Sequence, residues 1–584
     1  ASYSGIRTQL AVSSDENAWV YALVAQSSGG LRGVYRSTNS GASFSEVYSS
    51  STKNLLGWDC SGFGSGGQGG YDLCIASDPN DAETVYVGGV NTWKSIDGGS
   101  SFTIVNHWSG CTGIQTVHAD KHFFAFQNGT STLFECNDGG LYKTSDGGTN
   151  WTELSSGMAI SQIYRMGVGQ TLVDEVIIGL QDNGTKSRLS GTWTDVIGGD
   201  GFECIVDYTD ENIQYGALYY GDIYRTTNYW NSSTNITSSL PGSGWWITPY
   251  VMDPDDNNTL YVGYEEVYKS TNQGNSWTSI SNFGDNDLRS LAVAPSDNDY
   301  IYAAGEHVIY RTTNGGNSWS DITGSLPVTF DNITYISIKH DDPNTAWVSI
   351  GGYNSDGVYE TTDGGSSWTN ISTGLPSIPV MSVIQNRQNA DSLELYAGTD
   401  VGVFVRIGDN NWSPFKNGLP NVVVTELDIY YDDTDTSNSR IYAASYGRGV
   451  WKSTLYAANL LSADFTGSPT TGTAPLTVNF TDQSSGSIVS WAWYFGDGGT
   501  DTVQNPQYTY NSPGTYTVSL AISSNTATDS IAKTDYISVS YPAPTSDFTA
   551  NPTSGVAPLT VDFTDQSIDS VNNWNWYFGD GGTD

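Results

Sequence analysis

The stretch Thr312–Trp319, which reads Thr-Thr-Asn-Gly-Gly-Asn-Ser-Trp, carries the pattern that decides the fold. The pattern is Ser/Thr-x-Asp/Asn-x-Gly-x-x-Trp/Phe, and further full copies occupy residues 37–44, 95–102, 144–151, 270–277 and 361–368. An Asp or Asn side chain accepts hydrogen bonds from its own turn, Gly adopts positive φ, and an aromatic ring can pack between neighbouring sheets. The pattern therefore predicts tight hairpins, whose structural turn residues are Asn39, Asp97, Asp146, Asn272, Asn314 and Asp363.

Weaker copies of the pattern near Trp193, Asn228 and Trp412 complete a regular series. Most of the aromatic anchors are 41 to 49 residues apart, which is typical of a four-stranded propeller blade. Short β-rich runs bounded by Gly, Asn, Asp and Pro predict the strands between them. Residues 1–455 are therefore predicted to form about ten blades of an all-β propeller. The last unit lacks a fourth strand, and we expect the N-terminal segment to cover its edge.

The repeated turn is similar to the Asp-box of sialidase-like and sortilin-like β-propellers. The resemblance to sortilin-like proteins implies one ten-bladed ring. Xyloglucanase-like hydrolases, which the repeat also resembles, have two seven-bladed rings, and this chain would then contain part of such a pair. The ten predicted units favour the single ring and leave the second arrangement open.

Two copies of another repeat follow the propeller region. The first includes residues 474–478 and 491–498, and the second includes residues 557–561 and 576–581. Both closely resemble the polycystic-kidney-disease (PKD) domain, an immunoglobulin-like sandwich, and alternating strands between turn signals agree with that fold. The second copy holds only the first half of the repeat, so we expect the natural chain to continue past Asp584. The predicted domains are a propeller at 1–455, a linker at 456–461, a first PKD domain at 462–540, a linker at 541–545 and an incomplete second PKD domain at 546–584.

The charge balance limits the class of partner. The 584 residues include 22 Lys and Arg against 62 Asp and Glu, which gives a formal net charge of −40. This composition excludes a nucleic-acid binder that works through a basic surface, and it disfavours docking to anionic lipid. No run of the sequence approaches ~18 apolar residues, so direct membrane insertion is not expected.

Several segments between Trp58 and Trp451 extend the resemblance beyond the repeated turn. They are residues 66–69, 71–73, 117–122, 137–140, 181–185, 199–201 and 446–449. Their order is similar to that of large secreted propeller–PKD proteins of the phylum Bacteroidota, many of which leave the cell by type IX secretion. The resemblance implies a secreted or cell-surface protein whose signal peptide has been removed. It also implies O-glycosylation at Asp-Ser/Thr-aliphatic triplets, here at Ser392, Thr502, Ser530 and Ser570.

One candidate metal site lies in the segment His118–His122. His118, Asp120 and His122 are predicted to alternate along one inner strand and so to share a face. This arrangement could ligate a metal, although a hydrogen-bonded polar ladder is the interpretation that we favour. The Asp-rich turn at residues 253–256 could also hold a divalent metal such as Ca²⁺, but it lacks the ligand register of an EF-hand.

Four carboxylates are candidates for catalysis, because Asp138, Asp182, Asp200 and Glu203 fall at ends or turns of predicted inner strands. Paired carboxylates can hydrolyse glycosides with retention when they are ~5 Å apart, or with inversion at ~6.5–9.5 Å. An Asp or Asn before Gly is also ordinary turn chemistry. The structural interpretation is therefore favoured over catalysis.

Two cysteines and several aromatic residues bear on an extracellular role. Cys60 and Cys111 flank the second blade, and an exported protein could join them in a disulfide. Flat aromatic faces could stack on sugar rings, with packing between blades as the alternative. The aromatic candidates are Trp58, Trp108, Trp245, Trp246 and Tyr353.

Taken together, these patterns predict an extracellular or cell-surface protein that is not an enzyme. The propeller would be a binding or assembly surface, the PKD domains would be a stalk, and the role would be adhesion or self-assembly. The expected partners are a glycan, a protein or further copies of the chain. The alternative is a secreted glycoside hydrolase of the xyloglucanase-like type that acts on polysaccharide.

Overall fold

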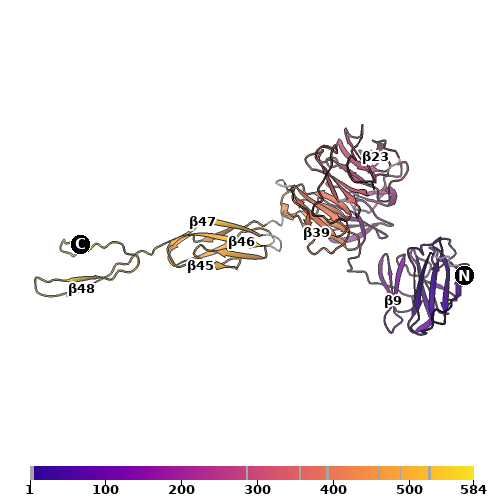
Figure 1. Ribbon diagram of the computed structural model, residues 1–584, viewed down its shortest axis with the longest axis horizontal. Coiled ribbons are helices and arrows are strands. Elements are labelled where there is room, and N and C mark those ends of the chain that lie inside the picture. The colour runs from indigo at the N-terminus through magenta and orange to yellow at the C-terminus, as the bar shows by residue number, and fades with distance from the viewer. Residues whose placement is uncertain are drawn as a thin grey trace. The chain divides into compact units, whose positions relative to one another are not determined.

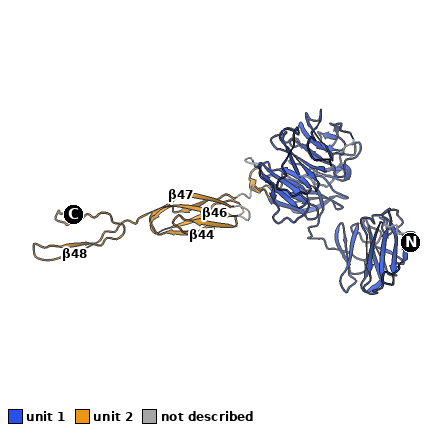
Figure 2. Cartoon of the chain, in the orientation of Figure 1, with its two compact units in different colours: residues 1–431, 440–453 blue, residues 432–439, 454–584 orange. Residues whose placement is uncertain are grey.

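The computed structural model describes residues 6–284, 287–329, 331–353, 357–389, 393–456, 461–486, 488–523 and 528–584. Within these ranges the regular structure is β-strand, apart from two short 3-10 turns, η1 (Tyr219–Gly221) and η2 (Thr436–Asn438). Two compact units are distinguished: residues 1–431 with 440–453, and residues 432–439 with 454–584 (Figure 2). None of the described residues belongs to a helix of the length and apolarity that crossing a membrane requires.

The repeated turn has the chemistry that its sequence predicts. Asn314 Oδ1 accepts the backbone N–H of Ser318 at 2.9 Å, and it also accepts the hydroxyl of Thr312 at 2.9 Å. The Thr312 oxygen accepts the N–H of Gly316, which has a φ of +94°. A Cβ at Gly316 would lie 2.7 Å from the Cβ of Ile280 in the preceding blade. The bond from the i+4 backbone N–H recurs at Asn39, Asp97, Asp146, Asn272 and Asp363.

The aromatic residue of the turn then joins its blade to the blade before it. Trp319 Nε1 donates to the carbonyl oxygen of Ile280 at 2.7 Å. Equivalent bonds run from Trp277 to Ile236, from Trp368 to Ile322 and from Trp412 to Ile371. The same local motif therefore closes a hairpin and fixes the contact between adjacent sheets.

Three four-stranded sheets form an open arc, β1–β12, which includes β9 in Figure 1. Tyr21 and Val34 of the first sheet pack with Val85 and Trp93 of the second, and Cys74 and Tyr86 of the second pack with Phe124 of the third. The strands are β1 (Arg7–Val12), β2 (Val20–Ala25), β3 (Leu31–Ser37), β4 (Ser45–Ser49), β5 (Cys74–Asp78), β6 (Asp81–Gly88), β7 (Thr92–Ser95), β8 (Thr103–Asn106), β9 (Lys121–Phe126), β10 (Leu133–Asn137), β11 (Gly140–Thr144) and β12 (Thr152–Glu153).

The next seven sheets form a closed ring, β13–β39, which includes β23 and β39 in Figure 1. Each sheet is an antiparallel meander, and at most junctions its first strand packs against the first strand of the neighbouring sheet. The strands are β13 (Ile163–Val168), β14 (Val176–Leu180), β15 (Gly184–Leu189), β16 (Thr192–Ile197), β17 (Cys204–Val206), β18 (Gln214–Ala217), β19 (Ile223–Thr226), β20 (Thr234–Asn235), β21 (Tyr250–Met252), β22 (Leu260–Gly263), β23 (Val267–Ser270), β24 (Thr278–Ser279), β25 (Ser290–Val293), β26 (Tyr300–Ala304), β27 (Ile309–Thr313), β28 (Ser320–Asp321), β29 (Asn332–Ile338), β30 (Ala346–Gly351), β31 (Val358–Thr361), β32 (Thr369–Asn370), β33 (Val380–Gln385), β34 (Glu394–Thr399), β35 (Gly402–Ile407), β36 (Ser413–Pro414), β37 (Val424–Tyr430), β38 (Arg440–Ser445) and β39 (Gly449–Thr454).

Contacts between β13 and β37 close the ring after seven blades. The Thr425 hydroxyl donates to the Ile163 carbonyl at 2.8 Å, and the Val168 N–H donates to Asp428 Oδ2 at 3.0 Å. The favoured prediction of one ten-bladed ring is therefore wrong. The seven-bladed ring of the second arrangement is present, and the other three blades form the arc that precedes it.

The last blade of the ring has three strands, β37, β38 and β39. The N-terminal segment does not complete it, because β1 pairs with β2 as the first strand of the first arc sheet. The predicted role of the N-terminal segment at the edge of the last blade is therefore wrong. Packing between the first and last blades, which includes Tyr442 and Ala444 against Ile178 and Met166, closes the ring, and the described residues add no fourth strand to the last blade.

The first PKD repeat is a two-sheet sandwich. One sheet has the order β40-β42-β45 and the other β41-β47-β46-β43-β44. Between them lies a fully buried Trp493, with the ring of Phe465 in an edge contact at 5.1 Å. The strands are β40 (Phe465–Ser468), β41 (Thr471–Thr473), β42 (Leu476–Asp482), β43 (Ser490–Tyr494), β44 (Thr500–Asp501), β45 (Gln507–Tyr510), β46 (Gly514–Ser523) and β47 (Thr528–Ser540).

The second PKD repeat contributes one hairpin, β48 (Phe548–Asn551) with β49 (Asp562–Asp565). Phe548 and Phe563 are exposed, whereas the equivalent Phe465 and Phe480 of the first repeat are buried. In this hairpin the apolar side chains of the repeat do not enclose a core.

Candidate functional site

Three aspartates from the distinctive sequence segments converge where the arc meets the ring, and a fourth, Asp72, lies beside one of them, Asp120. We call Asp72, Asp120, Asp138 and Asp182 the acidic cluster. Asp72 precedes β5, Asp120 precedes β9 and Asp138 lies between β10 and β11, all in the arc, whereas Asp182 lies between β14 and β15 of the ring. One carboxylate oxygen from each of Asp120, Asp138 and Asp182 lies within 4.8 Å of the others.

Polar neighbours hold two of these carboxylates, and the backbone of Asp182, in place. The Tyr71 hydroxyl donates to Asp138 Oδ2 at 2.7 Å, and His122 Nε2 lies 2.7 Å from Asp138 Oδ1. Gln68 Nε2 donates to Asp120 Oδ1 at 2.9 Å. Asp200 is the neighbour on the ring side, because its Oδ1 accepts the N–H of Asp182 at 2.7 Å.

The protonation of the cluster depends on burial and on mutual repulsion. Burial, followed by the charge of Asp120, raises the pKa of Asp72 to about 8. Burial and the charges of Asp200 and Asp138 raise the pKa of Asp182 to about 6. At Asp138 burial acts against the hydrogen bonds from His122 and Tyr71, but those bonds prevail and lower the pKa.

The predicted alternation of His118, Asp120 and His122 on one strand is wrong. Strand β9 begins only at Lys121, and Asp120 has the left-handed φ of 63°. Asp120 therefore turns toward Asp138 and Asp182, while His118 Nε2 contacts the carbonyl oxygen of Asp182 at 2.9 Å. Of the three residues, Asp120 joins the group of converging ligand atoms, and the two histidines contact its acidic neighbours.

Glu203 belongs to a different site, inside the channel of the ring. Its Oε2 lies 3.4 Å from Arg165 Nε, and both side chains are largely buried. Glu426 Oε2 accepts the N–H of Met166 across the ring closure. Burial, opposed by Arg165, raises the pKa of Glu203 to about 7, and burial together with Glu203 raises the pKa of Glu426. The four proposed catalytic carboxylates thus do not form one constellation.

A pocket of about 450 Å³ opens at one end of this channel. Its lining comes from the starts of inner strands and from loops between second and third strands, which lie at the same end of each blade. We call it the mouth pocket and define it by Tyr164, Trp245, Arg289, Tyr353, Asp400 and Tyr446. The Tyr353 hydroxyl donates to Asp400 Oδ2 at 2.7 Å, and the Arg289 guanidinium lies 4.0 Å from the centre of a Trp245 ring.

The mouth pocket and the acidic cluster are neighbours. Tyr164 and Tyr446 line the pocket, with ring centres 5.7 Å apart. Burial raises the pKa of Tyr446, and Tyr164 and the charges of Asp182 and Asp138 add to this effect. A charge bound in the acidic cluster would therefore act on two aromatic side chains of the pocket.

The other sugar-stacking candidates lie elsewhere. Trp246 stacks on Tyr219, with ring centres 5.7 Å apart. Trp108 Nε1 donates to the carbonyl oxygen of Trp58 at 3.2 Å, beside the second arc blade. Of the five aromatic candidates, Trp245 and Tyr353 line the mouth pocket.

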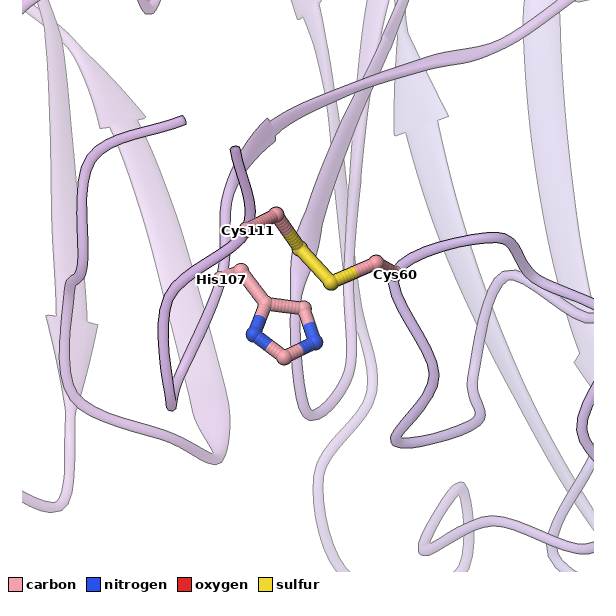
Figure 3. A group of neighbouring side chains, drawn as sticks. All are labelled: Cys60, His107 and Cys111. Carbon is pink, nitrogen blue, oxygen red and sulfur yellow. A yellow bond between two sulfur atoms is a disulfide. The ribbon is translucent and has the colours of Figure 1, made fainter. Parts of the chain in front are cut away.

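A disulfide joins Cys60 to Cys111, with Cα atoms 6.2 Å apart. Figure 3 shows the bond beside the imidazole of His107, whose Nε2 lies 2.9 Å from the carbonyl oxygen of Trp58. The two sulfur atoms and His107 would have the spacing of metal ligands, but sulfurs joined to each other are not available as thiolates. Cys74, Cys136 and Cys204 are free thiols.

Three of the four predicted O-glycosylation sites lie within the described residues. Thr502, Ser530 and Ser570 are exposed, whereas Ser392 lies outside the described residues. Modification of these hydroxyls stays a prediction.

Sequence reasoning missed Asp72, Arg165, Arg289, Glu426 and Asp428 as site residues. Asp72 lies in a segment singled out for its family resemblance, next to Tyr71. Glu426 and Asp428 alternate with apolar residues in β37, so their side chains face the ring closure. Two acids on the inward face of a strand are a usable signal of a buried polar site.

Two family models match parts of the chain. Residues 461–539 match the model described as PKD domain, and residues 265–397 match the model described as Sortilin, neurotensin receptor 3. The second repeat type is therefore a PKD domain, and four blades of the ring contain sortilin-like sequence.

Three solved structures are similar to parts of this chain at low overall superposition. The GH74 enzyme of Niastella koreensis is 16% identical, with 85% of this chain and 83% of that chain covered and a TM-score of 0.26. The extracellular domain of BT3049 from B. thetaiotaomicron is 11% identical, with 89% and 71% covered and a TM-score of 0.40. The PKD1 domain of Vibrio anguillarum Epp is 30% identical over 14% of this chain and 95% of its own, with a TM-score of 0.12.

Proposed function

We propose that this protein is a non-enzymatic carbohydrate-binding protein of the cell exterior. In this proposal the mouth pocket holds the ligand, and the PKD repeats act as a spacer. The role would be adhesion, with a glycan as the partner. The observation that carries the proposal is a concave site, lined by aromatic rings and a few polar groups, at the end of a closed ring.

The mouth pocket has the chemistry that a sugar requires. Its volume of about 450 Å³ lies within the ~300–1,000 Å³ of typical small-ligand sites. Tyr353 is 68% exposed, and its hydrogen bond to Asp400 fixes the direction of its ring. Asn332 and Thr334 add polar groups to the same wall. An exposed aromatic face beside hydrogen-bonding groups suits the apolar face and the hydroxyls of a pyranose.

The charged groups near the pocket favour binding over hydrolysis. Arg165 lines the pocket and pairs with Glu203, while Glu426 is held by a backbone N–H. Neither glutamate is part of the pocket lining among the described residues. The pocket wall therefore offers Asp400 as its carboxylate, and glycoside hydrolysis ordinarily uses two.

Glycoside hydrolysis stays the second candidate function because two carboxylates of the acidic cluster lie close together. Carboxylate oxygens of Asp138 and Asp182 lie within 4.8 Å of each other, close to the ~5 Å of retaining glycosidases. Both oxygens of Asp138, however, already accept hydrogen bonds from Tyr71 and His122.

A glycan array with the purified 584-residue chain tests the proposal. We expect retention of a defined set of oligosaccharides and weaker retention by Tyr353→Ala. Tyr494→Ala is the matched control, because Tyr494 is an exposed tyrosine of the PKD sandwich. Release of new reducing ends from a β-glucan panel by the parent chain would instead establish the hydrolase.

A further inference from the structure

Asp72 is a buried carboxylate with no hydrogen-bond donor. Its side chain is fully buried, and neither Oδ1 nor Oδ2 has a hydrogen-bond partner among the described residues. The Asp72 carboxylate faces that of Asp120, which is itself 7% exposed. When both are ionised, two carboxylates that face each other hold only acceptors, and a buried charge is costly unless it is paired or bound to a metal.

The basic side chains around the cluster are engaged elsewhere. Lys121 Nζ donates to the carbonyl oxygens of Val90 and His118 and lies 3.8 Å from Glu135 Oε1. Arg7 donates to the carbonyl oxygen of Tyr71. His122 contacts Asp138. The pair of Asp72 and Asp120 therefore lacks a direct cationic partner within the described residues, although the positive charge of nearby Lys121 partly offsets their negative charges.

We propose that the acidic cluster binds one Ca²⁺ ion, with carboxylate oxygens of Asp72, Asp120, Asp138 and Asp182 as ligands. The converging atoms are oxygens, and Ca²⁺ prefers six to eight oxygen ligands in an adaptable arrangement. The imidazole Nε2 atoms of His118 and His122 already contact the Asp182 carbonyl and the Asp138 carboxylate. The donor set thus favours a hard cation over Zn²⁺.

The ion would also connect two parts of the propeller region. Three of the ligands come from the arc, and Asp182 comes from the ring. Among the described residues, the contacts that cross this boundary include the bond from Asn183 Nδ2 to the Asp138 carbonyl oxygen at 3.0 Å. Bound Ca²⁺ would hold the arc against the ring and replace repulsion among their carboxylates with shared coordination.

Calorimetry on the whole 584-residue chain tests the site. After treatment with chelator, CaCl₂ is titrated into the parent, Asp72→Asn, Asp182→Asn and Asp255→Asn. We expect one saturable site in the parent and in Asp255→Asn, and loss of that site in the other two. Asp255 is a matched control, because it is an exposed acid in the Asp-rich turn at residues 253–256.

Thermal unfolding distinguishes loss of a ligand from misfolding. Without Ca²⁺, Asp72→Asn should melt at a higher temperature than the parent, because an amide can donate to Asp120 where a carboxylate cannot. The parent should gain stability from Ca²⁺ and Asp72→Asn should not. Ca²⁺ binding by Asp72→Asn equal to that of the parent would overturn the proposal. A parent melting temperature that responds to pH and not to Ca²⁺ would also overturn it, since a shared proton would then bridge the pair.

Discussion

At the scale of single residues, the fold depends on side chains that satisfy backbone groups. In the turn around Asn314, one amide oxygen accepts both a backbone N–H and a hydroxyl. The indole N–H of the tryptophan that follows donates to a carbonyl oxygen of the neighbouring blade. Local sequence could predict this turn because every partner but the last lies within four residues.

Replacement of Trp319 by Phe should show how much the hydrogen bond between adjacent blades contributes to stability. Phe keeps most of the apolar contact with Phe283 but leaves the Ile280 carbonyl oxygen without its indole donor. We expect the free energy of unfolding to fall by ~1–3 kcal/mol in urea denaturation. Trp193→Phe is the control, because Trp193 is 42% exposed and makes no indole hydrogen bond to a described residue; an equal loss in both variants would contradict the assigned role.

The buried acid Glu203 should make stability depend on pH. Burial raises its pKa to about 7, against ~4.3 for an unfolded Glu, although Arg165 opposes the shift. The folded chain then keeps a proton that the unfolded chain loses between these values, so stability should fall as pH rises from about 4 to about 7. Glu426 and Asp428, whose pKa values burial also raises, should act in the same direction.

Melting temperatures from pH 5 to pH 8 check this expectation. Glu203→Gln should have a shallower decline than the parent, whereas Glu265→Gln, at an exposed position, should decline like the parent. Parallel curves for the parent and Glu203→Gln would contradict the assignment.

At the scale of elements, blades were predictable and their closure was not. Each hairpin follows from turn residues that lie next to each other in sequence. Closure at seven depends on pairs such as Val168 with Asp428 and Ile163 with Thr425, about 260 residues apart. No local pattern encodes such pairs, so counting ten units led to the wrong ring. The error at Asp120 has a similar origin, because a left-handed φ ended the strand that alternation predicted.

The Cys60–Cys111 disulfide should stabilise the arc and not the ring. It closes a loop with a sequence separation of 51 residues in the second arc blade, and such loops are typically stabilised by ~2–4 kcal/mol. The double variant Cys60→Ser/Cys111→Ser should lower the temperature at which the arc unfolds and leave the unfolding temperature of the ring unchanged. Hydrogen exchange followed by peptide mass spectrometry can assign each transition, and equal loss of protection in the ring would contradict this assignment.

At the scale of the whole molecule, the site residues came from distant parts of the sequence. The acidic cluster draws on segments more than 100 residues apart, from Asp72 to Asp182. Sequence reasoning selected three of its four members, but it divided them between a metal site and a catalytic site. It missed Asp72, since only the fold shows that this carboxylate is buried without a donor.

The central claim is that the mouth pocket binds carbohydrate. Isothermal titration of the strongest oligosaccharide from the array into the parent, Tyr353→Ala and Tyr494→Ala tests it most directly. We predict one site per chain, a dissociation constant raised ~10-fold by loss of the Tyr353 ring, and no change in Tyr494→Ala. Equal affinity in all three proteins would contradict the claim.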